Sequence, residues 1–335
     1  MATDATTIRL SVLDRSRTRQ GEEPARALRE TVAFAQQVER LGYHRFWVSE
    51  HHGVPGVAGS APTVLAAAVA AATTRIRVGT GGVMLPNHQP LVVAEQFGVL
   101  AALFPGRIDM GLGRSVAFTD GVRRALGRDK DAADRFPEQL AELLGYFDGS
   151  PRTHRDVHAR PAEGLHVPAF VLATGAGADL AADAGLPLVI AAAHGPDRML
   201  AAIDRYRARF RPSAQAPEPY VVVSGTVAVA GSAERAAELL VAEAWSSAYA
   251  RTHGEFPPLL PAGEVLDREM SPRERAAYQQ ALGGHIAGTP AQAVAELRAL
   301  MERTGADEYL VTTSTHDRAA LLDSYRLLAE AVPLG

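Results

Sequence analysis

The stretch Tyr43-His44-Arg45-Phe46-Trp47-Val48-Ser49-Glu50-His51-His52 decides how the rest of the chain is interpreted. Aromatic and β-branched side chains dominate its first part, which is typical of a buried β-strand that breaks at Gly53. The strand ends in a carboxylate and two imidazoles, those of Glu50, His51 and His52. Such groups are costly to bury without partners, and imidazoles exchange protons near neutral pH. The stretch therefore predicts a strand whose end carries side chains suited to proton transfer.

Short apolar segments alternate with helical segments along the whole chain. The expected strands cover residues 8–13, 43–49, 76–85, 107–112, 169–172, 187–190, 220–230 and 308–313. The expected helices cover residues 24–41, 62–72, 90–103, 136–147, 178–184, 196–210, 233–250 and 290–303, with a last helix from Asp317. Strands that alternate with helices form a parallel sheet covered by helices. The pattern predicts an α/β fold of the closed (β/α)8 TIM-barrel type, with a doubly wound open sheet as the alternative.

Two stretches interrupt this alternation. Residues 116–134 are polar and are expected to form a loop. Residues 251–285 are rich in Pro, Glu and Arg and carry their own short helical pattern at 272–281. Because the composition does not change elsewhere, we expect a single domain over residues 1–335 with one insertion at about 251–285.

The composition narrows the possible partners. Of the 335 residues, 47% are hydrophobic and 21% are charged, as in ordinary globular proteins, and the net charge is −4. This charge gives no electrostatic reason to expect nucleic acid or a membrane surface as a partner. The chain has no cysteine, which excludes disulfides and thiolate catalysis and fits the cytoplasm. No apolar run resembles a signal peptide or a membrane span.

Glycines recur where the expected strands end. Gly81 and Gly82 lie in the third strand, Gly113 and Arg114 follow the fourth, and Thr174-Gly175-Ala176-Gly177 follows the fifth. Glycine lets a flat or phosphorylated ligand approach the backbone, and the first amides of a helix bind anions. A single glycine could simply turn a tight corner, but the clusters together favour a ligand site. Residues 174–177 lack the third glycine of a dinucleotide fingerprint, so a phosphate monoester is expected there.

The end of the second strand could also ligate a metal, because imidazoles and carboxylates are common ligands. Neighbouring residues of an extended strand point to opposite sides, however, which disfavours one ion shared by His51 and His52. We therefore expect no metal, one functional histidine and one structural histidine. Asp109, inside the fourth strand, is expected to pair with Arg77 or Arg107.

Several motifs carry a resemblance to a known family. They are Gly42 to His52, Arg75-Ile76-Arg77-Val78-Gly79-Thr80-Gly81-Gly82-Val83-Met84-Leu85-Pro86-Asn87-His88, Ala94-Glu95-Gln96-Phe97, Pro105 to Arg114, Gly185-Leu186-Pro187, Gly288-Thr289-Pro290 and Gly305-Ala306-Asp307-Glu308. With them the chain resembles the bacterial-luciferase-like family of flavin-dependent monooxygenases, which has the (β/α)8 fold. The match runs from near residue 8 to the C-terminus and is most specific in its first third.

The resemblance assigns roles around the flavin ring. His51 matches the active-site histidine that assists proton transfer at the flavin, and Glu50 and His52 are expected to position it. Gly81-Gly82 matches a site where a non-proline cis peptide lies against the isoalloxazine ring. Gly113 lies where some relatives carry a cysteine, so no thiol acts there in this chain.

The resemblance also assigns the phosphate contacts. Arg114 matches a phosphate-binding arginine, and Thr174-Gly175-Ala176-Gly177 matches a second phosphate contact. Relatives usually have serines and a larger residue in that second segment, whereas here only Thr174 offers a hydroxyl. This departure keeps a different flavin or a deazaflavin open as the cofactor.

The resemblance implies a two-component monooxygenase. A partner flavin reductase would supply reduced FMN, and O2 would be used to oxidise a small organic substrate. An F420-dependent hydride-transfer oxidoreductase and a non-catalytic flavin-binding relative are the alternatives. The resemblance further implies a homodimer built on helices 62–72 and 90–103, and a mobile insertion at 251–285 that closes over the site.

Overall fold

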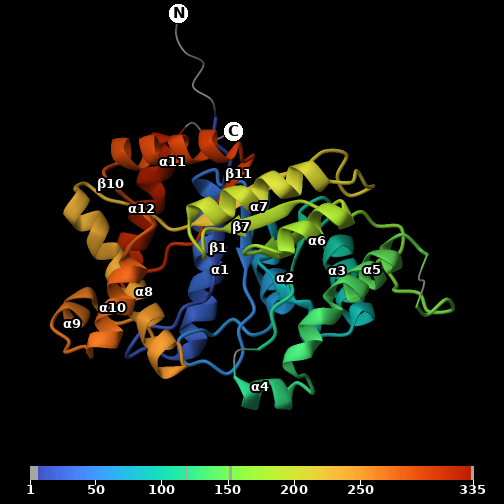
Figure 1. Cartoon of the computed structure of the whole chain (residues 1–335), viewed down its shortest axis with the longest axis horizontal. Coiled ribbons are helices and arrows are strands. Elements are labelled where there is room, and N and C mark those ends of the chain that lie inside the picture. Colours follow the sequence, from blue (N-terminus) through green and yellow to red (C-terminus); the bar gives the residue numbers. More distant parts are fainter. Residues whose placement is uncertain (1–6, 118, 151–152, 333–335) are drawn as a thin grey trace, which may run out of the picture. The chain divides into compact units, whose positions relative to one another are not determined.

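The computed structural model describes residues 7–117, 119–150 and 153–332 of the chain. Its strands are β1 (Leu10–Asp14), β2 (Arg45–Val48), β3 (Arg77–Thr80), β4 (Val83–Met84), β5 (Ile108–Gly113), β6 (Ala169–Ala173), β7 (Leu188–Ala191), β8 (Val221–Gly225), β9 (Val227–Val229), β10 (Ile286–Gly288) and β11 (Glu308–Val311). In the described residues one sheet has the order β3-β2-β1-β11-β8-β7-β6-β5-β4, and β3 also pairs with β5, so the sheet closes. This parallel barrel, surrounded by helices, confirms the predicted (β/α)8 fold (Figure 1).

Most expected helices are present within a residue or two of their expected limits. The α-helices are α1 (Pro24–Arg40), α2 (Pro62–Ala72), α3 (Pro90–Leu103), α4 (Asp120–Ala125), α5 (Phe136–Phe147), α6 (Gly177–Ala184), α7 (Pro196–Arg209), α8 (Ala233–His253), α9 (Ala262–Leu266), α10 (Pro272–Leu282), α11 (Pro290–Thr304) and α12 (Arg318–Ala331), and the 3-10 helices are η1 (Leu85–Asn87) and η2 (Lys130–Arg135). Proline opens α1, α2, α3, α7, α10 and α11, because its fixed φ suits the first helical position. Within the described ranges, no helix has the length and hydrophobicity needed to cross a membrane.

Three segments differ from the sequence-based expectation. Residues 76–85 form two strands, β3 and β4, which are separated at Gly81-Gly82. Residues 220–230 also form two strands, because β9 leaves the barrel sheet and pairs in parallel with β10, a strand that was not predicted. The expected loop at 116–134 contains α4 and η2, which begin at the capping side chains of Thr119 and Asp129.

The contacts of the chain group it into two compact units. Unit 1 contains residues up to Phe46, Gly53–Gly59 and residues from Val223 onward, and unit 2 contains Trp47–His52 and Ser60–Val222. The single domain over residues 1–335 stays a prediction, and both of its ends lie outside the described residues.

Unit 1 contains a buried ion pair beside β1 and β11. These strands pair in parallel, with Leu10 opposite Tyr309. The side chain of Glu308 is 0% exposed and lies 3.0 Å from Arg45 Nε. The Ser11 hydroxyl also donates to this carboxylate. Removing one member of such a group leaves an uncompensated buried charge, so the group fixes how β1 and β11 pack in unit 1.

Unit 2 also contains a buried carboxylate in an ion pair, that of Asp109 on β5. Asp109 Oδ1 lies 2.6 Å from Arg77 Nη2, and Asp109 Oδ2 accepts a hydrogen bond from Trp47 Nε1 at 3.1 Å. The pairing of Asp109 with Arg77 was one of the two expected from the sequence and is confirmed. A methyl group at Gly79 would overlap the backbone of Asp109, so glycine is required where these strands approach.

The insertion is packed within unit 1. Its helices α9 and α10 lie beside α8 (Figure 1), and the buried Trp245 donates from Nε1 to Glu274 Oε1 at 3.0 Å. Leu259 N donates to Thr18 O at 2.9 Å, which joins the start of the insertion to the loop after β1. The mobility of residues 251–285 stays a prediction.

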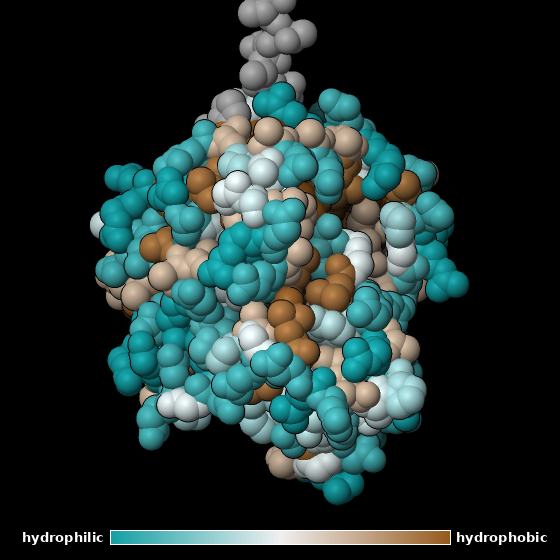
Figure 2. Space-filling model, turned by 90° about the vertical axis from the view of Figure 1, so that its left-hand side faces the viewer, coloured by the Kyte–Doolittle hydropathy of each residue, from teal (hydrophilic) through white to brown (hydrophobic). Residues whose placement is uncertain are grey.

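Figure 2 shows a face on which hydrophobic residues form small groups among hydrophilic ones.

Replacing Asp109 by asparagine is expected to lower the free energy of unfolding by about 3 kcal/mol, because Arg77 then loses its buried counter-charge. Urea unfolding followed by circular dichroism measures this change. Asp183→Asn is the matched control, because Asp183 pairs with Arg209 at the surface, where the loss should stay below about 1 kcal/mol. Equal losses in the two variants would contradict the assigned role of Asp109.

Candidate active site

The carboxylate of Glu50 organises the end of β2. Its side chain is 0% exposed and accepts hydrogen bonds from His52 Nε2 at 2.7 Å and from His88 Nε2 at 2.9 Å. The backbone N–H of Met84 donates to the other carboxylate oxygen at 2.8 Å. Because a carboxylate only accepts hydrogen bonds, each imidazole nitrogen donates here. These contacts join Glu50 to His52, and their predicted role in positioning His51 stays a prediction.

These donors keep the buried carboxylate charged. Burial by itself raises the pKa of Glu50, because it disfavours the ionised form. Hydrogen bonds from the two imidazoles, the charge of His88 and the amide of Met84 outweigh burial and lower the pKa to about 2. Glu50 is therefore an anion at neutral pH.

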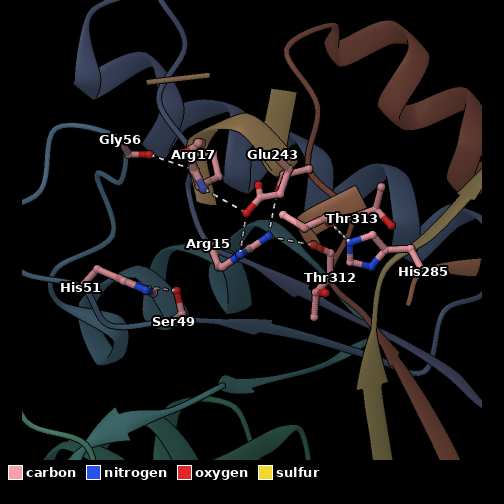
Figure 3. A network of polar contacts seen from close by, with 12 residues as sticks. Arg15, Arg17, Ser49, His51, Gly56, Glu243, His285, Thr312 and Thr313 are labelled. Carbon is pink, nitrogen blue, oxygen red and sulfur yellow. Dashed lines mark hydrogen bonds and ion pairs between the residues drawn. The ribbon is translucent and has the colours of Figure 1, made fainter. Parts of the chain in front are cut away.

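His51 has a different environment from His52. Its Nδ1 lies 3.2 Å from Ser49 Oγ, and the two side chains point toward one another (Figure 3). His52 instead bonds to Glu50, so the adjacent imidazoles have separate partners. Which of the two histidines is structural and which is functional stays a prediction. Within the described residues, no group of three or more metal-ligating side chains is arranged to hold an ion.

The Gly81-Gly82 peptide is cis, as the resemblance implied. Gly81 N donates to Val48 O at 2.8 Å, which ties the peptide to β2. A methyl group on Gly82 would lie 2.8 Å from Gly111 O, so a side chain at this position would collide with β5. The segment that follows pairs with β5, where Met84 lies opposite Gly113.

Gly113 and Arg114 lie at the carboxyl end of β5. A methyl group on Gly113 would meet only Val83 O, at 3.9 Å, so local packing does not require glycine at this position. Arg114 is exposed. Active sites of parallel barrels form at the carboxyl ends of the strands, so both residues lie at the end of the barrel where a site is expected.

Thr174, Gly175 and Ala176 connect β6 to α6, and Gly177 is the first residue of α6. The N-cap residue of α6 is Ala176, whose side chain cannot cap, and Thr174 is exposed. The first amides of α6 are therefore not capped by a side chain at the N-cap, and their binding of a phosphate stays a prediction. Two amides of this helix start donate locally, Ala178 N to Gly175 O at 3.0 Å and Asp179 N to Ala176 O at 3.2 Å.

Some members of the Glu50 group were not predicted from the sequence. His88 lies in a recognised motif but was given no role, and Asn87 Nδ2 lies 3.5 Å from Glu50. The amide of Met84 could not be predicted, because a backbone donor has no residue-type signal.

Unit 1 has a separate polar network, also drawn in Figure 3. Glu243 Oε1 lies 2.9 Å from Arg15 Nη1 and 3.1 Å from Arg17 Nη1. Burial lowers the pKa of Arg17, although the charge of Glu243 opposes this. Arg17 also donates to Gly56 O at 2.9 Å and to Pro257 O at 3.2 Å. The network therefore fastens the loop after β1 to α8 and to the start of the insertion.

A closed parallel barrel with titratable and glycine-rich groups at its strand ends is the architecture of a barrel enzyme. The chain belongs to the luciferase-like monooxygenase family, whose model, described as luciferase-like monooxygenase, matches residues 8–308. The resemblance inferred from the motifs is thereby confirmed.

Relatives and a solved structure agree with this assignment. A luciferase-like monooxygenase of Escherichia coli (strain K12) is 38% identical over 324 residues, which are 96% of each chain. N-acetyl-S-alkylcysteine monooxygenase of Bacillus subtilis (strain 168) is 47% identical over 156 residues, which are 46% of this chain and 47% of the relative. The solved structure of apo-MsnO8 is 33% identical, with a TM-score of 0.84 and 98% of each chain covered.

Replacing Glu50 by glutamine is expected to make the free energy of unfolding vary less with pH in the acid range. Glu50 has an ordinary pKa of 4.5 and a folded pKa of about 2, so its contribution is present above pH 4.5 and lost as pH falls toward 2. The shift corresponds to about 3 kcal/mol at neutral pH. Urea unfolding of wild type and Glu50→Gln between pH 2 and 7 should show a difference that shrinks toward low pH.

Glu163→Gln is the matched control, because Glu163 also pairs with an imidazole, that of His158 at 2.7 Å, but at the surface. This control should change stability little at any pH. A difference between wild type and Glu50→Gln that stays constant down to pH 2 would contradict the assigned ionisation of Glu50.

Proposed function

We propose that the protein is an FMN-dependent monooxygenase of the two-component type. A partner flavin reductase supplies reduced FMN, and O2 serves to oxidise a small organic substrate. The observation that carries this proposal is the strand end itself, where the anion of Glu50 holds His52 while His51 has a separate partner, in a chain of the luciferase-like monooxygenase family. The partial match to N-acetyl-S-alkylcysteine monooxygenase supports oxygenation over hydride transfer.

The strand ends of unit 2 fit a flat, phosphorylated cofactor. Gly81 and Gly82 would face the ring, because glycine leaves the backbone accessible. A methyl group on Gly175 would meet no atom within 4 Å, so this turn has open space for a ligand. Arg114 and the first amides of α6 would hold the phosphate, since both favour an anion.

The protein's part of the reaction is binding, orientation and proton handling. Bound reduced flavin supplies the electrons that activate O2. His51 holds or moves a proton at its imidazole, and the contact of Nδ1 with Ser49 orients the ring. Glu50 keeps His52 in a fixed place, which limits the positions that the adjacent His51 can adopt.

The segment at 174–177 favours a second candidate, an F420-dependent hydride-transfer oxidoreductase. Thr174 is the only hydroxyl-bearing residue in this segment, so few side-chain donors are available for a phosphate monoester. A non-catalytic flavin-binding protein is the third candidate, and the retained Glu50–His52 pair argues against it.

Anaerobic titration with reduced FMN and with reduced F420 separates these functions. We expect tight binding of reduced FMN, weak binding of F420, and O2 uptake when air and a substrate are added. His51→Ala should keep the affinity for FMN and lower turnover by about 100-fold or more, the usual effect of losing a general acid or base. His166→Ala, at an exposed site, is the control. Tight F420 binding with weak FMN binding, or no O2 uptake with any substrate tested, would overturn the monooxygenase proposal.

We further propose that the protein forms a homodimer in which α2 and α3 of each copy make the interface. These helices pack together and expose large apolar side chains, since Val64 is 69% and Leu103 is 64% exposed. Exposed apolar groups on neighbouring helices favour burial against a partner. The cytoplasmic location stays a prediction.

A double variant, Val64→Asp with Leu103→Asp, is expected to sediment as a monomer at concentrations where wild type is a dimer, because each aspartate would be buried at the interface. Leu266→Asp on α9 is the matched control, since Leu266 is 63% exposed but belongs to neither helix. Sedimentation velocity measures all three proteins. A double variant with the mass of wild type would contradict this interface.

A further inference from the structure

His88 shares the carboxylate of Glu50 with His52. Its Nε2 lies 2.9 Å from Oε1 and 3.1 Å from Oε2, whereas His52 Nε2 lies 2.7 Å from Oε1. The side chain of His88 is 30% exposed, and the carboxylate it meets is fully buried. The imidazole of His88 therefore contacts the Glu50 carboxylate from residues 84–88, the segment that follows Gly81-Gly82.

The same carboxylate binds this segment twice. Met84 N donates to Glu50 Oε2 at 2.8 Å, and His88 closes the segment four residues later. Between them the chain makes the tight turn of η1, in which His88 N donates to Leu85 O at 3.0 Å. One anion thus fixes both ends of residues 84–88, the continuation of the glycine pair.

The backbone of His88 is held as well. Arg128 Nη2 donates to His88 O at 3.2 Å. His88 therefore stands between an anion at its side chain and a cation at its carbonyl. Both contacts oppose movement of the end of the segment away from β2.

We propose that His88 is a positioning residue that acts through Glu50 to hold Gly81-Gly82 in the place where the flavin ring binds. This inference rests on the proposed flavin function. It gives a role to a residue that neither touches the flavin nor transfers a proton in the proposed function. The hydrogen-bond donor of His88, and not a proton passed to substrate, is the property that matters.

The first test measures the protein without cofactor. Amide hydrogen exchange of residues 81–88, read by mass spectrometry on wild type, should become at least about tenfold faster in His88→Ala, because one anchor of the segment is lost. His88→Gln should restore slow exchange, since its amide N–H can reach the carboxylate. His158→Ala removes an imidazole from a surface pair with Glu163 and should leave residues 81–88 unchanged.

The second test titrates reduced FMN, without oxygen, into the same proteins. The Kd should rise at least about tenfold in His88→Ala and return to the wild-type value in His88→Gln. Failure of wild type to bind reduced FMN would count against the proposed function. Normal wild-type binding with an unchanged Kd in His88→Ala would overturn the role of His88 alone.

Two further outcomes also overturn the inference. One is exchange that accelerates equally throughout the chain in His88→Ala, which would make His88 a general stabilising residue. The other is a His88→Gln protein that behaves like His88→Ala. If His88→Ala does not fold, His88→Gln is compared with wild type alone. Agreement of the two proteins in hydrogen exchange and in Kd supports the inference, and a difference in either overturns it.

Discussion

The ionised carboxylate of Glu50 is the contact on which the candidate site depends. It is fully buried and bonds to a neighbour on its own strand end, His52, to Met84 N at the end of β4, and to His88 beyond β4. A buried anion without donors would be costly, so the strand end and the following segment hold one another in place. The cis Gly81-Gly82 pair, which is proposed to lie beside the flavin, stands between these anchors in sequence, and His51 follows the carboxylate directly.

The fold could be predicted because its signals are local. Prolines at the first helical positions and apolar strands between them placed most elements correctly, including α2 from Pro62 to Ala72. The predicted strands were wrong where the pairing partner of a strand determines which sheet it joins. Residues 220–230 are rich in valine, but β9 pairs with β10 and leaves the barrel sheet. The hydrophobic pattern alone does not distinguish two sheets.

The site was predictable where its groups are neighbours in the chain. Glu50, His51 and His52 stand together, and so do Gly81 and Gly82. The contacts that were missed join distant positions or use the backbone. Glu50 and His88 are separated by 38 positions, and the Met84 amide has no residue-type signal. The structure gives each imidazole a partner, Ser49 for His51 and Glu50 for His52, which strand alternation alone could not assign.

A crystal structure of Glu50→Gln, compared with wild type under the same conditions, tests the central claim most directly. Glutamine has one acceptor oxygen and an amide that donates, so it cannot accept from both imidazoles and from Met84 N at once. We predict that residues 84–88 move away from position 50 and that His52 loses its fixed orientation. A variant whose residues 81–88 and His52 superimpose on the wild type, with every donor in place, would contradict the claim that this carboxylate organises the site.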